Sequence, residues 1–589
     1  MLAAGAASPA GRLRYKIRTY GLNISSSSHL IVANLTLLGQ TFHAQGAVPK
    51  LLLESLQLRY PSFSRRSLGD YRVAAATVLS CAASPAPPPA PAAGNWSACV
   101  QAMGADGCGA YREKNAKHCE GCARRIAPQR DNVCFPQFAA NVTAWCESGP
   151  DSARSTAAGK SCTANESGYT VYNVSWFGSD GPTLQYSGTG TRFENCLFEQ
   201  VDYSGHDMDT TRGLGTAMII ASGGADDVFK RNTMRYVGCS VVYFAGVRSL
   251  SELNHCDHQA DLSNDGSCIQ IRSSSANNSV ARRNWATASA KMAVRLDSGS
   301  NTAFCPGEVN NTIEGNVALL SHGFELKNDY NTYVGNLALR PFDGDTTGAC
   351  CTERQPHRAC TSHGAHSATL FRVDFGRFAS ENSHSLLAAN VADSWSNGSL
   401  SGGVRDKSRQ NVFDAKVGEQ LRDALNHDFR PVAGSAVDKA GAGPYPRAAA
   451  HAESTSSTAA GGCASYWIPG RREWRATTPV PPTGSATARP DDLDLMFLGA
   501  LTGRAGGGDA AAGAQRHRVH FGAAAAALKP LGNVLEGGCN VQAVSAPGAG
   551  AAARSALPAN STWFWRVDAV DAQGAVQAVG EVWTFTVRS

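Results

Sequence analysis

Short stretches in the middle of the chain alternate apolar and polar residues and end on a charged residue. The clearest are Ile269-Gln270-Ile271-Arg272, Val294-Arg295-Leu296-Asp297 and Phe324-Glu325-Leu326-Lys327. Because successive side chains of a strand point to opposite faces, the apolar residues of each stretch would enter a core while the others face outward. The pattern predicts strands over 269–272, 294–297 and 324–327.

If these strands stack in parallel, about 4.8 Å apart, their outward residues form two adjacent ladders. The first ladder holds Gln270, Arg295 and Glu325, and the second holds Arg272, Asp297 and Lys327. Basic and acidic side chains would then share one flat face. A long, hydroxyl-rich or acidic polymer can bind to such a face, or be cleaved on it.

An asparagine recurs within strand-like segments along most of the chain. The recurring residues are Asn34, Asn173, Asn195, Asn232, Asn254, Asn284, Asn316 and Asn336. A β-rich repeat of about 20 to 30 residues is typical of a solenoid. Asparagine suits its corners because it tolerates left-handed backbone and can hydrogen-bond along a stack. The alternatives are a propeller, whose blades need about 40 residues, and a β-sandwich, which would not repeat one unit.

Changes in composition divide the chain into five segments. We expect N-terminal coil rungs over 1–80, a cysteine-rich insert over 81–162, the main coil over 163–445, a flexible linker over 446–474 and a β-sandwich over 475–589. The linker is rich in Ser, Thr, Ala and Gly, and the last segment ends in two aromatic, alternating strands.

The insert holds eight cysteines: Cys81, Cys99, Cys108, Cys119, Cys122, Cys134, Cys146 and Cys162. An even number within a short segment indicates a disulfide-stapled module. The pair Cys119 and Cys122 has the spacing of half a zinc site, but no second such pair follows. We therefore expect disulfides here, with a connectivity that the spacing does not reveal.

Composition restricts the class of protein. The net charge of +5 over 589 residues argues against a dedicated nucleic-acid binder, and no apolar run is long enough for a membrane helix. Eighteen cysteines and ten N-glycosylation sequons indicate the secretory route, so we expect an extracellular or cell-wall monomer. The segment Met1-Leu2-Ala3-Ala4-Gly5 does not read as a signal peptide, and we infer a missing N-terminus.

Motifs in residues 264–340 carry a family resemblance. They are Asp265-Gly266 with Ile269-Gln270, Arg283-Asn284-Trp285, Val294-Arg295-Leu296-Asp297 and Lys327. This stretch resembles the right-handed parallel β-helix proteins related to pectate lyases, most closely a secreted, uncharacterised group of them. The resemblance implies an all-β chain, a right-handed parallel β-helix solenoid. The Asp-Asp, Gly-His and Arg-x-Lys set of polygalacturonases and a calcium-lyase signature are both missing.

The C-terminal segment carries a second resemblance, through Val519-His520-Phe521-Gly522, Trp565-Arg566-Val567-Asp568 and Val582-Trp583-Thr584-Phe585. It is similar to the fibronectin type III-like modules that often follow such coils. Trp563, Trp565 and Trp583 alternate along its strands, which favours the core of a sandwich over a platform for sugars. Fold alone does not imply a reaction in either part.

The outward ladders offer two kinds of chemistry. A lyase acting on a uronate must neutralise the carboxylate and remove a neighbouring proton, and Arg295 and Lys327 are candidates for these tasks. Asp297 and Glu325 can hold calcium, tune the base or, at a separation of about 5 to 9 Å, serve as the two carboxyls of a glycosidase. Gln270 and Arg272 would bind substrate.

Other interpretations compete with catalysis. Opposite charges on neighbouring strands often pair only to keep a sheet face soluble. The run His255-Cys256-Asp257-His258 is expected in a loop, which either lines the same groove or has no role in it. Asp207, Asp209, Asp226 and Asp227 are candidates for binding calcium, but a solvated turn is the favoured interpretation. The cluster at Cys350, Cys351, His357, Cys360, His363 and His366 matches no standard zinc spacing.

Two functions therefore remain in view. The leading hypothesis is a secreted carbohydrate-active protein that acts on an extracellular polysaccharide by β-elimination or hydrolysis. The second is a non-catalytic cell-wall or matrix protein that binds glycans or mediates adhesion. A groove walled by the loops 255–267 and 343–366 would favour the enzyme, and a flat, solvated face would favour the binder.

Overall fold

We describe the chain from a computed structural model of its 589 residues. The structure describes residues 20–25, 29–45, 48, 50–61, 77–80, 168–179, 184–187, 189–201, 217–221, 224–238, 241–259, 267–271, 277–289, 292–296, 310–321, 323–326, 330–339, 371–373, 385–393, 410–446, 466–490, 493–501, 516–535, 540–543, 556–571 and 573–589. The fold is all-β, with parallel sheets stacked in a coil that is consistent with a β-helix solenoid.

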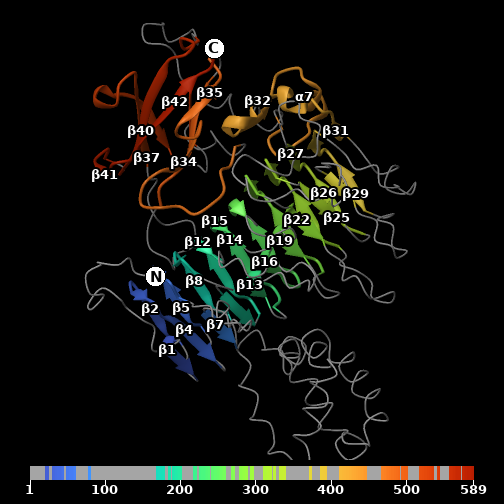
Figure 1. Cartoon of the computed structure of the whole chain (residues 1–589), viewed down its shortest axis with the longest axis vertical. Helices are drawn as coiled ribbons and strands as arrows, with labels where there is room; N and C mark the ends of the chain where they lie inside the picture. The colour runs from blue at the N-terminus through green and yellow to red at the C-terminus, as the bar shows by residue number, and fades with distance from the viewer. Residues whose placement is uncertain are drawn as a thin grey trace, which may run out of the picture.

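Three parallel sheets form the coil, and each strand pairs with the third strand after it (Figure 1). Sheet A contains β1 (Tyr20–Ser25), β4 (Thr41–Gln45), β7 (Thr77–Ser80), β10 (Leu184–Ser187), β13 (Ala217–Ala221), β16 (Val241–Ala245), β19 (Ser267–Ile271), β22 (Met292–Leu296), β25 (Phe324–Leu326) and β28 (Phe371–Val373). Three successive strands, one per sheet, make one rung.

Sheet B contains β2 (Ile31–Ala33), β5 (Leu52–Glu54), β8 (Thr170–Tyr172), β11 (Arg192–Glu194), β14 (Val228–Lys230), β17 (Leu250–Glu252), β20 (Val280–Arg282), β23 (Thr312–Glu314), β26 (Thr332–Val334) and β29 (Leu386–Ala388). Sheet C contains β3 (Thr36–Leu38), β6 (Gln57–Arg59), β9 (Ser175–Phe177), β12 (Leu197–Val201), β15 (Thr233–Val237), β18 (His255–Gln259), β21 (Trp285–Thr287), β24 (Val317–Leu319), β27 (Leu337–Leu339), β30 (Val391–Ala392) and β31 (Val412–Phe413). Because β5 pairs with β8, the rungs on either side of the cysteine-rich segment are adjacent. The insert itself, 81–162, lies outside the described residues.

Asparagines at the corner between sheets B and C fall into two classes. Asn34, Asn173 and Asn195 are themselves the left-handed turn residues, with φ of 57°, 54° and 58°. On later rungs the left-handed position passes to the residue before, as at Arg231 with φ 52°, and the asparagine that follows it, Asn232, is fully buried. One recurring residue type thus serves two geometries.

The buried asparagines form one continuous ladder along the coil. Its members are Asn232, Asn254, Asn284, Asn316, Asn336, Asn390 and Asn411. Asn254, for example, donates from Nδ2 and from its backbone N–H to Oδ1 of Asn284, at 3.0 and 2.8 Å, and donates again from Nδ2 to the Phe229 carbonyl at 2.8 Å. Its amide is therefore fully hydrogen-bonded inside the core, which fixes the register between rungs.

A second polar ladder follows the corner between sheets A and B. Its members are Thr191, Asp227, Ser249, Ser279, Asn311, Asn331 and Ser385. Asp227 is the one carboxyl among them: Oδ1 accepts from the Thr191 N–H at 2.9 Å, and Oδ2 accepts from the Tyr186 hydroxyl at 3.3 Å. Burial raises the pKa of Asp227 to about 7. The expected solvated turn is thus corrected at this residue, which has no exposed surface.

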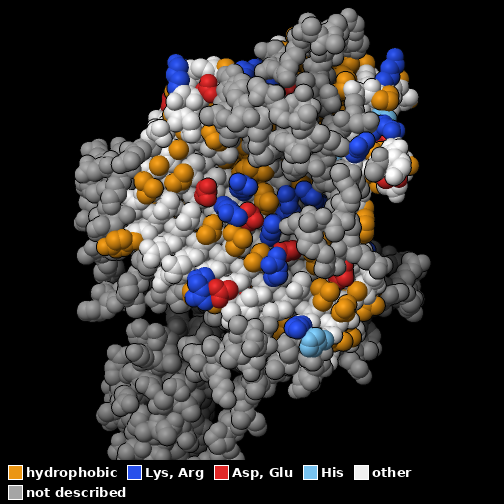
Figure 2. Space-filling view, turned by 180° about the vertical axis from the view of Figure 1, so that it is seen from behind, with side chains coloured by type: hydrophobic (Ala, Val, Ile, Leu, Met, Phe, Trp, Pro, Cys, Tyr) orange, Lys and Arg blue, Asp and Glu red, His pale blue; other side chains and the backbone are white. Residues whose placement is uncertain are grey.

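Outside the core, acidic and basic side chains pair across rungs. On sheet B, Arg282 Nε lies 2.8 Å from Oε1 of Glu252 on the preceding rung, and Lys230 lies 3.7 Å from the same carboxylate on the other side. Charges of both signs also stand side by side across the middle of the face seen in Figure 2. Such cross-strand pairs keep an outer sheet face soluble.

The coil ends in a small cap. It consists of η5 (Val417–Gln420), β32 (Leu421–Asp423), η6 (Ala424–Asn426), β33 (Asp428–Pro431) and α7 (Ala436–Ala440). Helix α7 is capped at both ends, because the Ser435 hydroxyl accepts from the Asp438 N–H at 3.1 Å and Gly441 adopts the left-handed conformation. Phe429 and Tyr445 pack with Trp285 of the coil, whose ring is fully buried.

Two sheets form the C-terminal sandwich, the first antiparallel and the second mixed, because one edge strand of the second pairs in parallel. One contains β34 (Thr477–Val480), β36 (Asp494–Leu498) and β39 (Asn540–Ala543); the other contains β35 (Ser485–Ala488), β37 (Arg516–Gly522), β38 (Lys529–Leu535), β40 (Thr562–Val570), β41 (Val576–Ala578) and β42 (Val582–Val587), and η7 (Ala525–Ala527) joins β37 to β38. Trp563, Trp565 and Trp583 are at most 5% exposed, so they are core residues as predicted.

Residues 466–475, here called the strap, join the cap to the sandwich and run along the outside of the coil. The Gly470 N–H donates to the Leu253 carbonyl at 2.8 Å, Arg471 N–H to Thr233 Oγ1 at 2.8 Å, and Arg472 N–H to Asn195 Oδ1 at 2.7 Å. Each of these bonds lies one rung closer to the N-terminus than the last. This stretch differs from the flexible linker expected over 446–474, because its backbone is hydrogen-bonded and Ile468 is fully buried.

Candidate functional site

The predicted ladder on sheet A has the expected register. Gln270 pairs with Arg295, and Arg295 with Glu325, on adjacent strands β19, β22 and β25. Their apolar neighbours Ile269, Ile271, Val294, Leu296, Phe324 and Leu326 are at most 1% exposed and belong to the coil's core. The alternation in the sequence therefore correctly predicts which side chains point inward.

The same ladder is not an open face. Gln270 and Glu325 are only 1% and 3% exposed. Arg295 Nε lies 2.7 Å from Oε2 of Glu325, so this pair is a buried ion pair. The flat outward face predicted for these side chains is corrected at Gln270 and Glu325, which are covered, because outward-pointing side chains of a sheet can still lie beneath other segments. Arg272, Asp297 and Lys327 lie outside the described residues, so the role of Arg272 in binding substrate and the roles of Asp297 and Lys327 in catalysis stay predictions.

A second arrangement, which sequence reasoning missed, lies on sheet C where the strap meets the sandwich. There a cleft of about 430 Å³ opens between the first rungs of the coil, the strap and the β41 region. Its lining comes from Gln57, Leu58, Arg59, Asn173, Ser175, Phe177, Leu197, Glu199, Arg471, Glu473, Trp474, Arg475, Leu501, Ala578 and Val579. Segments more than 400 residues apart in the chain thus share one concave surface.

Arg471 fixes the floor of the cleft. Its guanidinium donates to Ser175 Oγ at 2.7 Å and to Asn173 Oδ1 at 2.9 Å. Asn173 also receives a hydrogen bond from Asn195 Nδ2 at 3.3 Å, and its own Nδ2 donates to Ser55 Oγ at 3.2 Å. The left-handed asparagines of the early rungs thereby anchor the strap, and Arg471 is committed to this structural task.

Trp474 is the most accessible large apolar residue that the structure describes, with 65% of its surface exposed. It follows directly after strap residues that are held in place, since the Leu501 N–H donates to the Glu473 carbonyl at 2.6 Å. Arg475 beside it pairs with Glu581 of the sandwich at 2.5 Å. An indole ring is thus presented at the cleft between a backbone hydrogen bond at Glu473 and an exposed side-chain ion pair at Arg475.

The charges at the cleft are partly paired. Glu199 accepts two hydrogen bonds from Arg235 on the next rung, at 3.0 and 3.2 Å. Arg59 lies two rungs from Glu199 on the same outward column and forms no ion pair with any residue in the described ranges. The cleft can therefore offer a guanidinium, carboxylates and an aromatic ring to one ligand.

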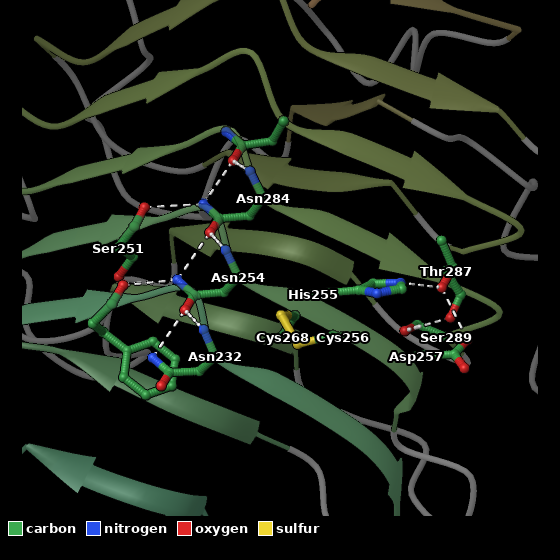
Figure 3. The surroundings of a disulfide bond; sticks show 12 residues. Asn232, Ser251, Asn254, His255, Cys256, Asp257, Cys268, Asn284, Thr287 and Ser289 are labelled. Atoms are coloured by element: carbon green, nitrogen blue, oxygen red, sulfur yellow. Dashed lines mark hydrogen bonds between the residues drawn. A yellow bond between two sulfur atoms is a disulfide. The ribbon is translucent and has the colours of Figure 1, made fainter. Parts of the chain in front are cut away.

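Further along sheet C lies a polar cluster beside the disulfide Cys256–Cys268 (Figure 3). The Thr287 hydroxyl donates to Asp257 Oδ1 at 2.9 Å and lies 2.9 Å from His255 Nε2. Burial by itself would raise the pKa of Asp257. Hydrogen bonds from His258 and Thr287 and the nearby charges of His255 and His258 outweigh it and lower the pKa of Asp257 to about 2. Residues 255–258 lie in strand β18, which corrects the loop expected from the sequence.

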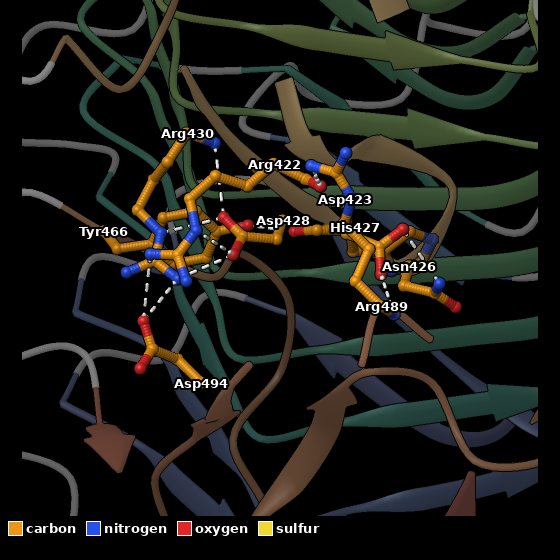
Figure 4. Close-up of polar contacts among 9 residues, drawn as sticks. All are labelled: Arg422, Asp423, Asn426, His427, Asp428, Arg430, Tyr466, Arg489 and Asp494. Carbon is orange, nitrogen blue, oxygen red and sulfur yellow. Dashed lines mark hydrogen bonds and ion pairs between the residues drawn. The ribbon is translucent and has the colours of Figure 1, made fainter. Parts of the chain in front are cut away.

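A network of four charged residues fixes the sandwich against the cap (Figure 4). Arg430 Nη2 lies 2.6 Å from Asp428 Oδ2 and 2.8 Å from Asp494 Oδ2, and Arg422 Nη1 lies 3.1 Å from the same oxygen of Asp494. Asp494 begins strand β36 of the sandwich, whereas the other three belong to the cap. Since every member has a partner, we interpret this cluster as a structural clamp.

No protein-family model, curated protein or solved structure matches this chain significantly. Within the described ranges, His, Cys, Asp and Glu side chains do not gather into any group of three that fits a metal ion. No helix in this part of the chain is long and apolar enough to cross a membrane. The eight insert cysteines and the cluster at 350–366 lie outside the described residues.

Proposed function

We propose that this protein is a secreted, carbohydrate-binding β-helix protein whose glycan site is the cleft between the strap, sheet C and the sandwich. The observation that carries this proposal is Trp474, which is 65% exposed in a concave setting lined by both polar and apolar side chains. The apolar faces of sugars stack on indole rings, while sugar hydroxyls bind to guanidinium and carboxylate groups such as Arg59 and Glu473.

The surrounding framework supports this assignment. The two anchors of the cleft, Arg471 on the coil and Glu473 against Leu501, hold the strap so that the backbone at Trp474 loses little conformational freedom on binding. In this proposal the coil is a right-handed, pectate lyase-like β-helix and the sandwich is fibronectin type III-like. A disulfide at Cys256–Cys268 and exposed sequon residues at Asn34, Asn310 and Asn560 are compatible with a secreted glycoprotein.

Binding to immobilised polysaccharides tests the proposal. The full chain would be run through native gels containing hydroxyethylcellulose, xylan, polygalacturonate or chitosan, with and without calcium. We expect retardation by at least one polymer, at least a tenfold weaker affinity in Trp474→Ala, and near wild-type affinity in Trp474→Phe.

Tyr330→Ala is the matched control, because Tyr330 is 54% exposed and lies on a corner of the coil between sheets A and B. It should bind as wild type does. Binding by wild type that is unchanged in Trp474→Ala would move the glycan site away from the cleft. The absence of binding to every polymer would refute the proposed function for this panel.

A second candidate function is cleavage of the polysaccharide at the sheet A ladder. It is favoured by the register that places Gln270, Arg295 and Glu325 side by side. In this proposal Arg295 and Lys327 neutralise and deprotonate a uronate, and Asp297 and Glu325 hold calcium or act as an acid and base pair. The ion pair between Arg295 and Glu325 weighs against it, because it engages both groups with each other.

Product release from the same polymers separates the two candidates. Unsaturated ends that require calcium and disappear in Lys327→Ala would establish a lyase, and new reducing ends without unsaturation would establish a hydrolase. Binding without release would leave the non-catalytic function in place.

A further inference from the structure

The outer face of sheet C carries chemistry beyond the cleft. Residues at the last outward position of successive strands stack one per rung. In order along the coil they are Arg59, Phe177, Glu199, Arg235 and Asp257. The first three line the cleft, and the Arg235 and Asp257 side chains are 43% and 30% exposed beyond it. A line of side chains, four of the five able to form hydrogen bonds, thus leaves the cleft along the coil axis.

Aromatic side chains flank this line at the turn position that follows it. The turn residues Tyr60, Gly178, Gln200, Tyr236 and His258 all have positive φ and occupy successive rungs. Tyr60 and Tyr236 are 54% and 41% exposed. The two tyrosines are three rungs apart, or about 14 Å at the usual strand spacing.

Each tyrosine ring leans onto the following rung. The Tyr60 ring packs over Gly178. A Cβ added to Gly178 would lie 2.6 Å from this ring, so the missing side chain of the glycine makes room for it. The ring also meets Phe177 edge-on, with centroids 5.7 Å apart. The Tyr236 ring meets His258 of the following rung at a tilt of 33°, with centroids 5.1 Å apart. Both rings are therefore held by neighbours while one part of each remains open to solvent.

The line of exposed groups has a clear end. The next residues in the same column, Thr287, Leu319 and Leu339, are 5%, 1% and 2% exposed. The accessible hydrogen-bonding groups therefore span the rungs from β6 to β18, and the column continues towards the N-terminus with the apolar Leu38 of β3, which is 50% exposed. Neighbouring groups in the column are one rung apart. The distance between rungs is close to the length that each sugar adds to an extended pyranose chain.

We propose that sheet C binds an extended, linear polysaccharide that runs along the coil axis from Trp474 and Tyr60 to Tyr236 and His258, about one sugar per rung. The inference rests on the proposed function and specifies its substrate class as a linear polymer of pyranoses. The aromatic rings stack on sugars at the two ends, and Glu199, Arg235 and Asp257 bind hydroxyls between them. Branched or globular glycans fit only the cleft.

The dependence of affinity on chain length tests this track. Cello-, xylo- and galacturonate oligosaccharides of two to eight units would be titrated into the full chain by calorimetry. For the series that binds, we expect affinity to rise up to about five sugars and then level off, as the rung count from β6 to β18 predicts.

Tyr236→Ala should weaken binding of the octamer about tenfold and leave binding of the dimer unchanged, whereas Trp474→Ala should weaken both. Tyr236→Phe should keep the wild-type dependence on length, and Tyr330→Ala is the control on another corner of the coil. A thermal melt of each variant verifies its fold.

The possible failures are distinct. An affinity that is flat beyond two sugars, or an octamer that binds Tyr236→Ala as tightly as wild type, would refute the track while the cleft remains the glycan site. A wild-type chain that binds no saccharide of any length would refute the cleft and the track together.

Discussion

The outer faces of sheets A and C are built from the same kind of strand, yet they differ in what they expose. On sheet A, the outward side chains Gln270 and Glu325 are at most 3% exposed, and Arg295 pairs with Glu325. On sheet C, Arg235 and Tyr236 remain accessible beside a cleft with Trp474 at its mouth. A polar residue that points away from the core is therefore not yet a residue that a ligand can reach.

The largest effect should come from breaking the covered pair on sheet A. We expect Glu325→Ala to lower the free energy of unfolding by about 3–5 kcal/mol, because it breaks a buried ion pair by removing the carboxylate that lies 2.7 Å from Arg295 Nε. Chemical denaturation would measure the loss. The double variant Arg295→Met with Glu325→Leu should recover most of it, and a loss in Glu325→Ala below about 1 kcal/mol would mean that the pair is solvated.

The pH dependence of stability should also separate the interior of the coil from its surface. Asp227 has a pKa of about 7 in the folded state and 3.8 as its ordinary value. Its neutral form is favoured by folding, so the free energy of unfolding should fall as the pH rises from about 4 to about 7 and change little above that. At about 1.4 kcal/mol per pKa unit the total is about 4 kcal/mol.

Asp227→Asn should flatten this profile, because an amide keeps the bond from Thr191 and carries no charge. Tyr186 and Tyr243 face the same carboxyl, and burial raises the pKa of both, so they stay neutral over this range. The adjacent Asp226 is paired with Arg248 on the surface, and Asp226→Asn is the matched control. Chemical denaturation of wild type, Asp227→Asn and Asp226→Asn between pH 4 and pH 9 would measure the free energy of unfolding of each. A wild-type free energy of unfolding that does not change with pH would contradict the prediction.

The smallest effect should come from the accessible pair on sheet C. Glu199→Ala removes the partner of Arg235, whose side chain is 43% exposed, so we expect a loss of about 0.2–1 kcal/mol in the free energy of unfolding. The same variant should weaken binding of glycans at the cleft. A loss of stability as large as that of Glu325→Ala would remove the contrast between the two faces.

Local sequence patterns predicted much of the coil. Alternation at residues such as Ile269 and Val294 predicted the inward face and the register with Phe324, since the period of a strand depends only on backbone geometry. The recurring asparagines predicted the corners. Their two classes were not predictable, because Asn195 and Asn232 differ by one position relative to the left-handed residue, and tertiary packing decides that offset.

The candidate site was much less predictable. Trp474 stands in a charged run, Arg471-Arg472-Glu473-Trp474-Arg475, which is an available signal within a segment otherwise expected to be a flexible linker. Nothing local indicates that this run lies against Asn173 and Ser175, nearly 300 residues earlier. The contact depends on the length of the coil and the path of the strap, which are properties of the whole chain.

The sequence by itself therefore determined the all-β class, the stacked strands and the side chains that face the core, because these follow from periodicity and from the conformational preferences of single residues. Only the tertiary structure decided which outward side chains are covered and which are open. Accessibility depends on segments that return from far away in the chain, and here those are the strap and the sandwich that frame the cleft on sheet C.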